Sequence, residues 1–201
     1  MARLLIHVEG QTEEGFVNDV LRDHLVAKGY YAVEARIIRN ARLRQRRGGI
    51  RAWSSVQMDI SRHLKEDPGC VATMLVDYYG LPQGEDGGWP GRARAATLPA
   101  AEKARCVENA LLANLGAAMG SRFDVRRFIP FVVMHVFEGL LFSDCAAFSR
   151  GIDRPDLEFG LQGDSGLDTR SRSLWSACHT GNRAGPYAGR VSSFQRLADA
   201  A

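Results

Sequence analysis

The sequence lacks the features that would place it in a membrane or in an oxidising compartment. It has no run of 18 or more apolar residues, so it offers no candidate for a transmembrane helix. The first apolar stretch is short and is followed at once by acidic residues, which does not fit a secretory signal peptide. The 4 cysteines are scattered and form no CxxC pair, which favours buried thiols over a zinc site or a disulfide framework. We therefore expect a cytoplasmic protein with no membrane partner.

The signatures of several enzyme classes are also missing. The sequence contains no GxxxxGK[ST] phosphate loop, and no GxGxxG motif follows the first expected strand, which excludes the common nucleotide-binding loops. It likewise contains no HExxH zinc motif and no GxSxG nucleophile elbow. The chemistry that remains open is the kind that carboxylates perform, with or without a metal ion.

The residues from Arg3 to Leu25 combine a short apolar run with a helical pattern. The run ends at Glu9, and we expect it to form a buried strand. Thr12 is the expected N-cap of the next helix, and Glu13 and Glu14 fall in the first turn, where the helix dipole favours anions. The apolar residues expected on the buried face of this helix are Phe16, Val17, Val20, Leu21 and Leu25.

Apolar runs and helical patterns alternate along the first 150 residues. Further strands are expected at 30–38, 70–76 and 128–135, and further helices at 51–64, 100–119 and 137–148. This alternation predicts an α/β domain at 1–150, a Rossmann-like parallel sheet of about four strands flanked by helices. Residues 78–94 contain two prolines and five glycines and are expected to form a long irregular loop. Residues 151–201 keep no period and are expected to form an irregular C-terminal extension.

Ionisable residues follow three of the expected strands, at the edge where parallel strands end. Glu9 follows the first strand, Asp77 the strand at 70–76, and His135 and Glu138 the last. Ligands of parallel sheets bind beyond this edge, and Mg²⁺ or Mn²⁺ prefers hard oxygen ligands. Taken singly, each acid is more often a helix cap, but together they favour a metal site. The expected metal ligands are Glu9, Glu13, Asp77 and Glu138.

The same residues are the candidates for catalysis. A site with one or two divalent metal ions can activate water and stabilise the leaving oxygen of a phosphodiester. Glu13 or His135 is the candidate for positioning that water, although a lone histidine at a strand end is more often structural. The candidate catalytic residues are Glu9, Glu13, Asp77, His135 and Glu138.

Arginine supplies 23 of the 26 basic residues, and seven of these lie between Arg36 and Arg51. The net charge is only +3, so it is the clustering that carries information. Guanidinium groups match phosphate oxygens, which makes the segment a candidate for binding nucleic acid, while a solvated loop is the alternative. The arginines expected to contact nucleic acid are Arg39, Arg42, Arg44, Arg46, Arg47 and Arg51.

Several segments of the chain resemble an uncharacterised bacterial Toprim-like family. The segments are VEGQTEE, LVDYYGLP, WPG and HVFEGLLFSD, and the resemblance extends from residue 3 to about residue 150. The Toprim fold is shared by primases, type IA and type II topoisomerases, small ribosomal-RNA maturases and the overcoming-lysogenization-defect nucleases. The resemblance implies that Glu9 is the Toprim glutamate, Asp77 the first aspartate of the DxD motif, and Glu13 the second acid of the nuclease branch.

The resemblance further implies a magnesium-dependent nuclease, acting in phage or plasmid defence beside a separately encoded ATPase. The chain departs from the family's pattern at two positions, since Tyr79 replaces the second aspartate of DxD and Val136 the first glutamate of HEFE. Residues from about Gly163 also lack the basic stretch and final helix of the family. A non-catalytic module that binds nucleic acid or protein is therefore the alternative, and a small-molecule phosphohydrolase is the third. The sequence leaves open the choice of DNA or RNA and the presence of a homo-oligomer.

Overall fold

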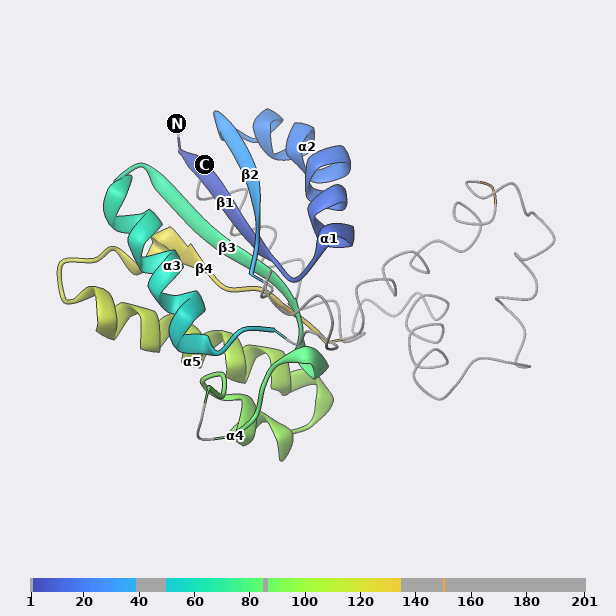
Figure 1. Ribbon diagram of the computed structural model, residues 1–201, viewed down its shortest axis with the longest axis vertical. Coiled ribbons are helices and arrows are strands. Elements are labelled where there is room, and N and C mark those ends of the chain that lie inside the picture. The colour runs from blue at the N-terminus through green and yellow to red at the C-terminus, as the bar shows by residue number, and fades with distance from the viewer. Residues whose placement is uncertain (1, 39–49, 85–86, 135–149, 151–201) are drawn as a thin grey trace. The chain divides into compact units, whose positions relative to one another are not determined.

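The computed structural model describes residues 2–38, 50–84 and 87–134, together with Arg150 (Figure 1). Apart from Arg150, these residues belong to one of the two compact units into which the chain divides. The helix predicted at 137–148 and the extension predicted at 151–201 lie outside the described residues. Within the described part of the chain, no helix is long and apolar enough to cross a membrane.

A parallel sheet forms the centre of this unit. Its strands are β1 (Arg3–Val8), β2 (Ala32–Ile37), β3 (Cys70–Asp77), β4 (Phe128–Ile129) and β5 (Val132–Val133). Their order is β2-β1-β3-β4, β5 also pairs with β3, and every pair is parallel. β3 is central and is buried from Cys70 to Val76, which explains its continuous apolar run. The predicted α/β, Rossmann-like class is confirmed.

The register brings the carboxyl ends of the strands to one edge of the sheet. Val8, the last residue of β1, is paired with Ile37 of β2 and with Leu75 of β3. Asp77, the last residue of β3, is paired with Val133 of β5. The predicted meeting of strand ends is therefore confirmed for these four strands.

The strand predicted at 128–135 is divided into β4 and β5. Pro130 lies between the two pieces and has no N–H to donate to a neighbouring strand, so the ladder is interrupted there. The backbone N–H of Val132 instead donates a hydrogen bond of 2.9 Å to Oε1 of Glu108. Pairing with β3 then resumes opposite Val76.

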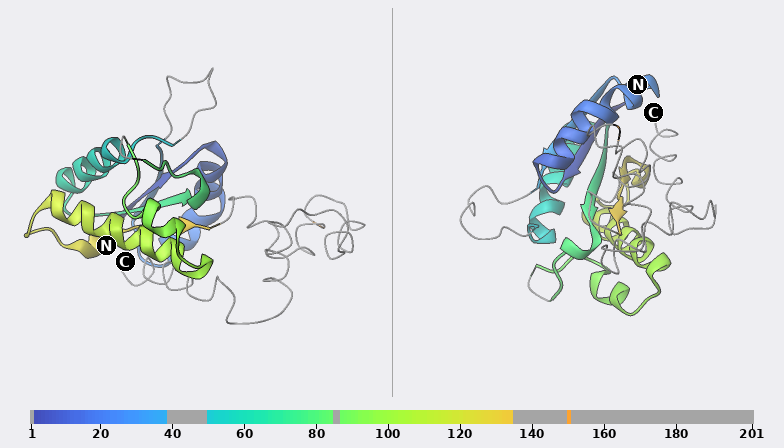
Figure 2. Two further views of the ribbon diagram at one scale, coloured as in Figure 1. Left: turned by 90° about the horizontal axis from the view of Figure 1, so that it is seen from below. Right: turned by 90° about the vertical axis from the view of Figure 1, so that its right-hand side faces the viewer.

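Helices cover both faces of the sheet (Figures 1 and 2). They are α1 (Gln11–Phe16), η1 (Val17–Leu21), α2 (Arg22–Ala27), α3 (Trp53–Glu66), η3 (Tyr78–Gly80), α4 (Arg92–Ala96), α5 (Ala100–Met119) and η4 (Val125–Arg127). Ile6 and His7 are neighbours on β1, so their side chains point to opposite faces. His7 contacts His63 of α3, whereas Ile6 lies beside Leu21 and Leu25.

α3 and α5 lie side by side, joined by a 2.6 Å hydrogen bond from Nε1 of Trp53 to Oδ1 of Asn114. The predicted bounds of α5 agree with the structure, and α3 begins and ends within two residues of its predicted range. The buried residues of α3 are those that its spacing predicts: Trp53, Val56, Ile60 and Leu64.

The helix after β1 differs from its prediction at Val20. Between α1 and α2 the chain forms η1, a π-helical segment whose hydrogen bonds span one residue more than those of an α-helix. The wider turn changes the direction in which the following side chains point. Val20 is therefore 57% exposed and its predicted burial is wrong, whereas Val17 and Leu25 are buried as predicted.

The stretch 78–94 was predicted to be irregular throughout, and this is wrong at both ends. It begins with η3 and ends inside α4, and both are too short to show a period in the sequence. Its side chains also anchor it, since Leu81, Trp89 and Arg92 are only 3%, 3% and 5% exposed. The loop is therefore packed against the domain at these three positions.

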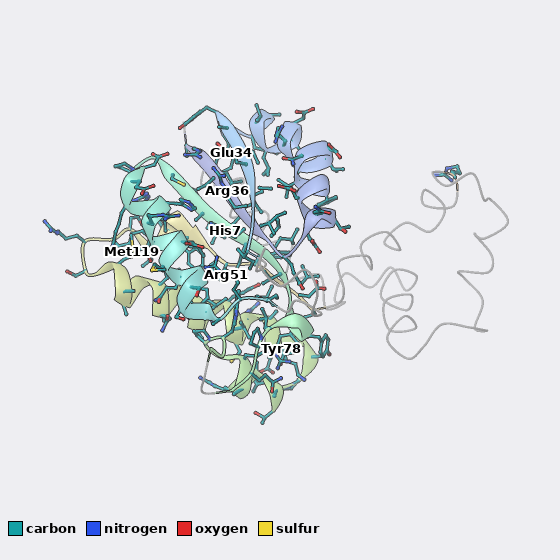
Figure 3. All side chains as sticks on the ribbon, in the orientation of Figure 1. His7, Glu34, Arg36, Arg51, Tyr78 and Met119 are labelled. Atoms are coloured by element: carbon teal, nitrogen blue, oxygen red, sulfur yellow. The ribbon has the colours of Figure 1, made fainter. Side chains whose placement is uncertain are left out.

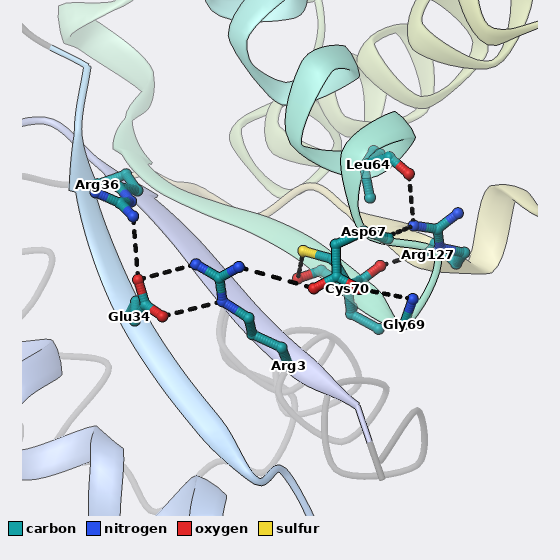
Figure 4. Close-up of polar contacts among 9 residues, drawn as sticks. Arg3, Glu34, Arg36, Leu64, Asp67, Gly69, Cys70 and Arg127 are labelled. Atoms are coloured by element: carbon teal, nitrogen blue, oxygen red, sulfur yellow. Dashed lines mark hydrogen bonds and ion pairs between the residues drawn. The ribbon is translucent and has the colours of Figure 1, made fainter.

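At the opposite edge of the sheet, arginines join the amino ends of the strands (Figure 4). Arg127 donates to the carbonyl oxygens of Leu64 at 2.8 Å and of Cys70 at 3.0 Å, which links the end of α3 to the start of β3. Arg3 on β1 forms a two-bonded ion pair with Glu34 on β2, with both distances 3.0 Å. The carboxyl edge of the sheet carries Glu9 and Asp77.

Candidate functional site

Glu9 and Asp77 lie at the carboxyl ends of two neighbouring strands. Glu9 follows Val8, and the register pairs Val8 with Leu75, two residues before Asp77. Adjacent strands are about 4.8 Å apart and each residue rises about 3.3 Å, so the two α-carbons are on the order of 6 Å apart. Both side chains are partly buried. The structure thus brings the backbones of these two predicted residues to the same place at the carboxyl edge of the sheet.

The Glu9 carboxylate lies against the turn that follows Asp77. A Cβ placed on Gly80 would be 3.4 and 3.5 Å from the two carboxylate oxygens of Glu9, and 3.4 Å from Cδ1 of Ile50. Gly80 is the last residue of η3, which begins directly after Asp77. Because glycine adds no side chain here, the turn can approach both oxygens closely.

Glu13 caps the N-terminus of α1. The helix begins at Gln11, so Gly10 is the N-cap and the predicted cap at Thr12 is wrong. The physical reason is that Oε2 of Glu13 accepts a 2.9 Å hydrogen bond from the N–H of Gly10, which fixes the start of the helix two residues earlier. Glu13 is partly buried and belongs to the helix that leaves the site edge.

Tyr79, at the position of the second DxD aspartate, is 53% exposed, whereas its neighbour Tyr78 is buried. The two rings meet edge to face, with centroids 5.1 Å apart and planes at 88°. Tyr79 carries a phenol in place of the carboxylate that a hard divalent cation prefers. The turn after Asp77 therefore differs in chemistry from a DxD pair.

Arg92 is buried and contacts Tyr78, the first residue of this turn, which Figure 3 labels. Its Nε donates to the backbone carbonyl of Tyr78 at 3.1 Å, its Nη1 to the phenol oxygen of Tyr78 at 2.9 Å, and its guanidinium carbon is 3.9 Å from the ring centroid. In the amide orientation that satisfies both groups, Oε1 of Gln83 accepts from Nη1 and Nη2 at 2.8 and 2.7 Å. Burial raises the pKa of Tyr78, and the Arg92 charge acts in the opposite direction.

Arg92, Gln83 and Gly80 were not among the site residues expected from the sequence. Arg92 looks like one more surface arginine in a glycine-rich stretch, and its burial depends on contacts with residues far from it in the sequence. The signal that could have found Gly80 is its position three residues after the strand-end Asp77, at the close of a tight turn.

Of the six arginines expected to contact nucleic acid, Arg51 is the one that the structure describes. Its Nη1 lies 2.6 Å from Oδ2 of Asp59, and its carbonyl oxygen accepts a 3.0 Å hydrogen bond from Nε1 of Trp89. Trp89 in turn contacts Trp53 at a centroid distance of 5.2 Å. A phosphate that contacts Arg51 would therefore share its guanidinium group with the Asp59 carboxylate.

The other predicted site residues lie outside the described part of the chain, and their roles stay predictions. They are His135 and Glu138 of the metal and catalytic set, and Arg39, Arg42, Arg44, Arg46 and Arg47 of the arginine segment.

His7 of β1 and His63 of α3 form a stacked pair, with ring centroids 5.7 Å apart. His7 is 1% exposed and donates from Nδ1 to the carbonyl of Thr73 at 3.1 Å, since a carbonyl can only accept. Burial lowers the pKa of His7 from 6.5 to about 4, with the Thr73 hydrogen bond acting in the opposite direction. Burial also lowers the pKa of His63. Both histidines are therefore expected to be neutral at pH 7.

The carboxylates at the edge suit a hard divalent cation. Mg²⁺ is commonly held by one or two carboxylates, several waters and substrate phosphates, which Glu9 and Asp77 could satisfy. Among the described residues, no group of three or more His, Cys, Asp or Glu side chains lies close enough together to hold a metal ion. A metal ion held by Glu9 and Asp77 would therefore complete its coordination with water and substrate.

Taken together, a parallel sheet with acids beyond its carboxyl edge defines an α/β protein of Rossmann-like architecture. The chain belongs to the family described as Domain of unknown function (DUF4276), whose sequence model matches residues 8–166. This range includes Glu9, Glu13, Asp77 and the arginine segment. No curated protein is significantly similar to the chain. The same holds for solved structures.

Proposed function

We propose that this protein is a Mg²⁺- or Mn²⁺-dependent nuclease that hydrolyses phosphodiester bonds in DNA or RNA. The observation that carries the proposal is the approach of the Glu9 carboxylate to the turn directly after Asp77. The resemblance of the chain to Toprim-like proteins, in particular the overcoming-lysogenization-defect nucleases, supports the same assignment. It is also the ground for proposing a role in phage or plasmid defence with an ATPase partner.

The residues of the candidate site have separate tasks in this proposal. Glu9 and Asp77 hold the metal, which when bound supplies a Lewis acid and lowers the pKa of water. Oε2 of Glu13 accepts the hydrogen bond from the N–H of Gly10, so Oε1 of Glu13 is the oxygen that orients water. The arginines of the segment hold the phosphate backbone by charge-assisted hydrogen bonds, which also makes binding salt-dependent.

The test is cleavage of single- and double-stranded DNA and RNA with Mg²⁺ or Mn²⁺. Glu9→Gln and Asp77→Asn each remove a charged ligand oxygen while keeping the shape of the side chain, so each should lower the rate by at least about 100-fold. Thermal unfolding should change little, because both residues lie at the sheet edge. Glu14→Gln is the control and should retain activity, because Glu14 lies beside Glu13 in the first turn of α1 and has no role in the proposal. Cleavage that survives both site changes refutes the assignment.

A non-catalytic module that binds nucleic acid or protein is the second candidate, favoured by Tyr79 at the position of an expected acid. Calorimetric titration with Mg²⁺ and Mn²⁺ separates the two. Metal binding that is lost in Glu9→Gln supports the nuclease. Absence of metal binding, with nucleic-acid affinity that falls steeply with salt, supports the module. A small-molecule phosphohydrolase would turn over nucleotides and leave polymers intact.

A further inference from the structure

Tyr79 is exposed at a place where an aromatic ring can meet a substrate. Two of the described tyrosines are more than half exposed, Tyr31 at 57% and Tyr79 at 53%. Tyr31 precedes β2, at the amino edge of the sheet, whereas Tyr79 follows the last residue of β3 by two positions. Of these two exposed tyrosines, Tyr79 is the one at the edge that carries Glu9 and Asp77.

The Tyr79 ring rests against a buried neighbour, which limits the directions that it can take. It meets Tyr78 edge to face, an arrangement in which the partner covers at most one face of the ring. Tyr78 is 1% exposed and is fixed by two hydrogen bonds and a cation–π contact from Arg92. Little side-chain entropy is then lost when a flat ligand stacks on Tyr79.

The position of the ring limits what the ligand can be. Tyr79 lies between Asp77 and Gly80, and Gly80 faces the Glu9 carboxylate. A base that stacks on Tyr79 therefore has its own phosphate within about one nucleotide of the acids. In a duplex both faces of each internal base are covered by its neighbours, so only an unpaired or terminal base can use the ring.

We propose that Tyr79 forms a stacking subsite for an unpaired nucleobase, so that the site takes single-stranded or locally unpaired nucleic acid. The stacking subsite adds a substrate preference to the proposed nuclease. It rests on that proposed function, which supplies the phosphodiester as the bond that reacts. Replacement of the second DxD aspartate by tyrosine then exchanges a metal ligand for a substrate contact.

The test measures binding of a labelled single-stranded oligonucleotide by fluorescence anisotropy, with the full chain and with EDTA present to prevent cleavage. Alanine substitution of a stacking aromatic weakens binding by about 5- to 150-fold, and Tyr79→Ala should fall in this range. Tyr79→Phe should bind as the wild type does, because the ring is kept. Tyr31→Ala, a change at an equally exposed tyrosine on the other edge, should also leave binding unchanged.

A second oligonucleotide in which every base is replaced by an abasic linker isolates stacking from charge. The wild type and Tyr79→Ala should bind it equally, because it retains phosphates and has no base to stack. Equal binding of the normal single strand by both proteins overturns the proposal, as does an equal loss on the abasic strand or no binding by the wild type. If Tyr79→Ala weakens binding but the wild type cleaves nothing with Mg²⁺, the stacking subsite stands and the nuclease proposal fails.

Discussion

Lowering the pH from 7 to 5 should destabilise the protein by about 2 kcal/mol through His7 alone. His7 is 1% exposed, and among the described residues its Nε2 has no hydrogen-bond partner. Burial disfavours the imidazolium ion and lowers the pKa from 6.5 to about 4, although the carbonyl of Thr73 acts against this change. The folded state therefore favours a neutral His7 ring.

The sign follows from the two pKa values of His7. The folded pKa lies below the unfolded one, so between pH 6.5 and about 4 the unfolded chain binds more protons, and stability falls as the pH falls. At 1.36 kcal/mol per pKa unit, the difference between 6.5 and about 4 amounts to about 3 kcal/mol. About 2 kcal/mol of this is lost between pH 7 and pH 5.

Urea unfolding followed by far-UV circular dichroism at pH 7 and pH 5 measures the effect. His7→Leu removes the titrating group, so its stability should differ between the two pH values by about 2 kcal/mol less than that of the wild type. Any packing change due to leucine cancels, because each variant is compared with itself. His24→Gln, a change at an exposed histidine on α2, should lose as much stability as the wild type. Some loss should remain in His7→Leu, because burial also lowers the pKa of His63. Equal losses in the wild type and His7→Leu would refute the reasoning.

Three further substitutions test the packing around the sheet, each by urea unfolding. Gly91→Ala should cost about 2–4 kcal/mol, because Gly91 has φ of 76° and a Cβ there would lie 2.8 Å from Cβ of Ala110. Gly15→Ala should instead stabilise by about 0.5–1 kcal/mol, because Gly15 is helical and its Cβ would have ordinary contacts. Arg127→Met should cost about 2–3 kcal/mol, because it leaves carbonyl groups at Leu64 and Cys70 without their charged donor.

The two glycine variants control each other, since the same chemical change is expected to act with opposite signs. A loss of stability in Gly15→Ala would contradict the assignment of helical geometry to that residue. Arg126→Met is the control for Arg127→Met, because the Arg126 side chain is 86% exposed and pairs only with nearby Asp124 among the described residues. Similar losses in the two arginine variants would show that the hydrogen bonds of Arg127 contribute little.

The central strands and long helices could be predicted because their signals are local. β3 is buried on both faces, so its apolar run is unbroken, and α3 places an apolar residue inward every three or four positions. The position of Glu9 and Asp77 at one edge of the sheet follows from the parallel arrangement alone. The break at Pro130 could also have been foreseen, since proline cannot donate to a strand ladder.

The features that the sequence could not predict depend on contacts between distant residues or on unusual winding. The burial of Arg92 needs Tyr78 and Gln83 around it, and no periodicity marks this. The exposure of Val20 follows from a π-helical turn whose sequence resembles any other amphipathic helix. The closeness of Gly80 to Glu9 exists only once β1 and β3 have paired.

The Trp53–Trp89 contact gives the protein a built-in optical signal. The two indoles are 5.2 Å apart and tilted by 55°, so their near-ultraviolet transitions couple and depend on that geometry. Trp53 begins α3, two residues after Arg51, and Trp89 belongs to the loop that follows Asp77 and Tyr79. Binding of an oligonucleotide or a metal ion that shifts either segment would change the coupled signal, so site occupancy could be followed in unlabelled protein.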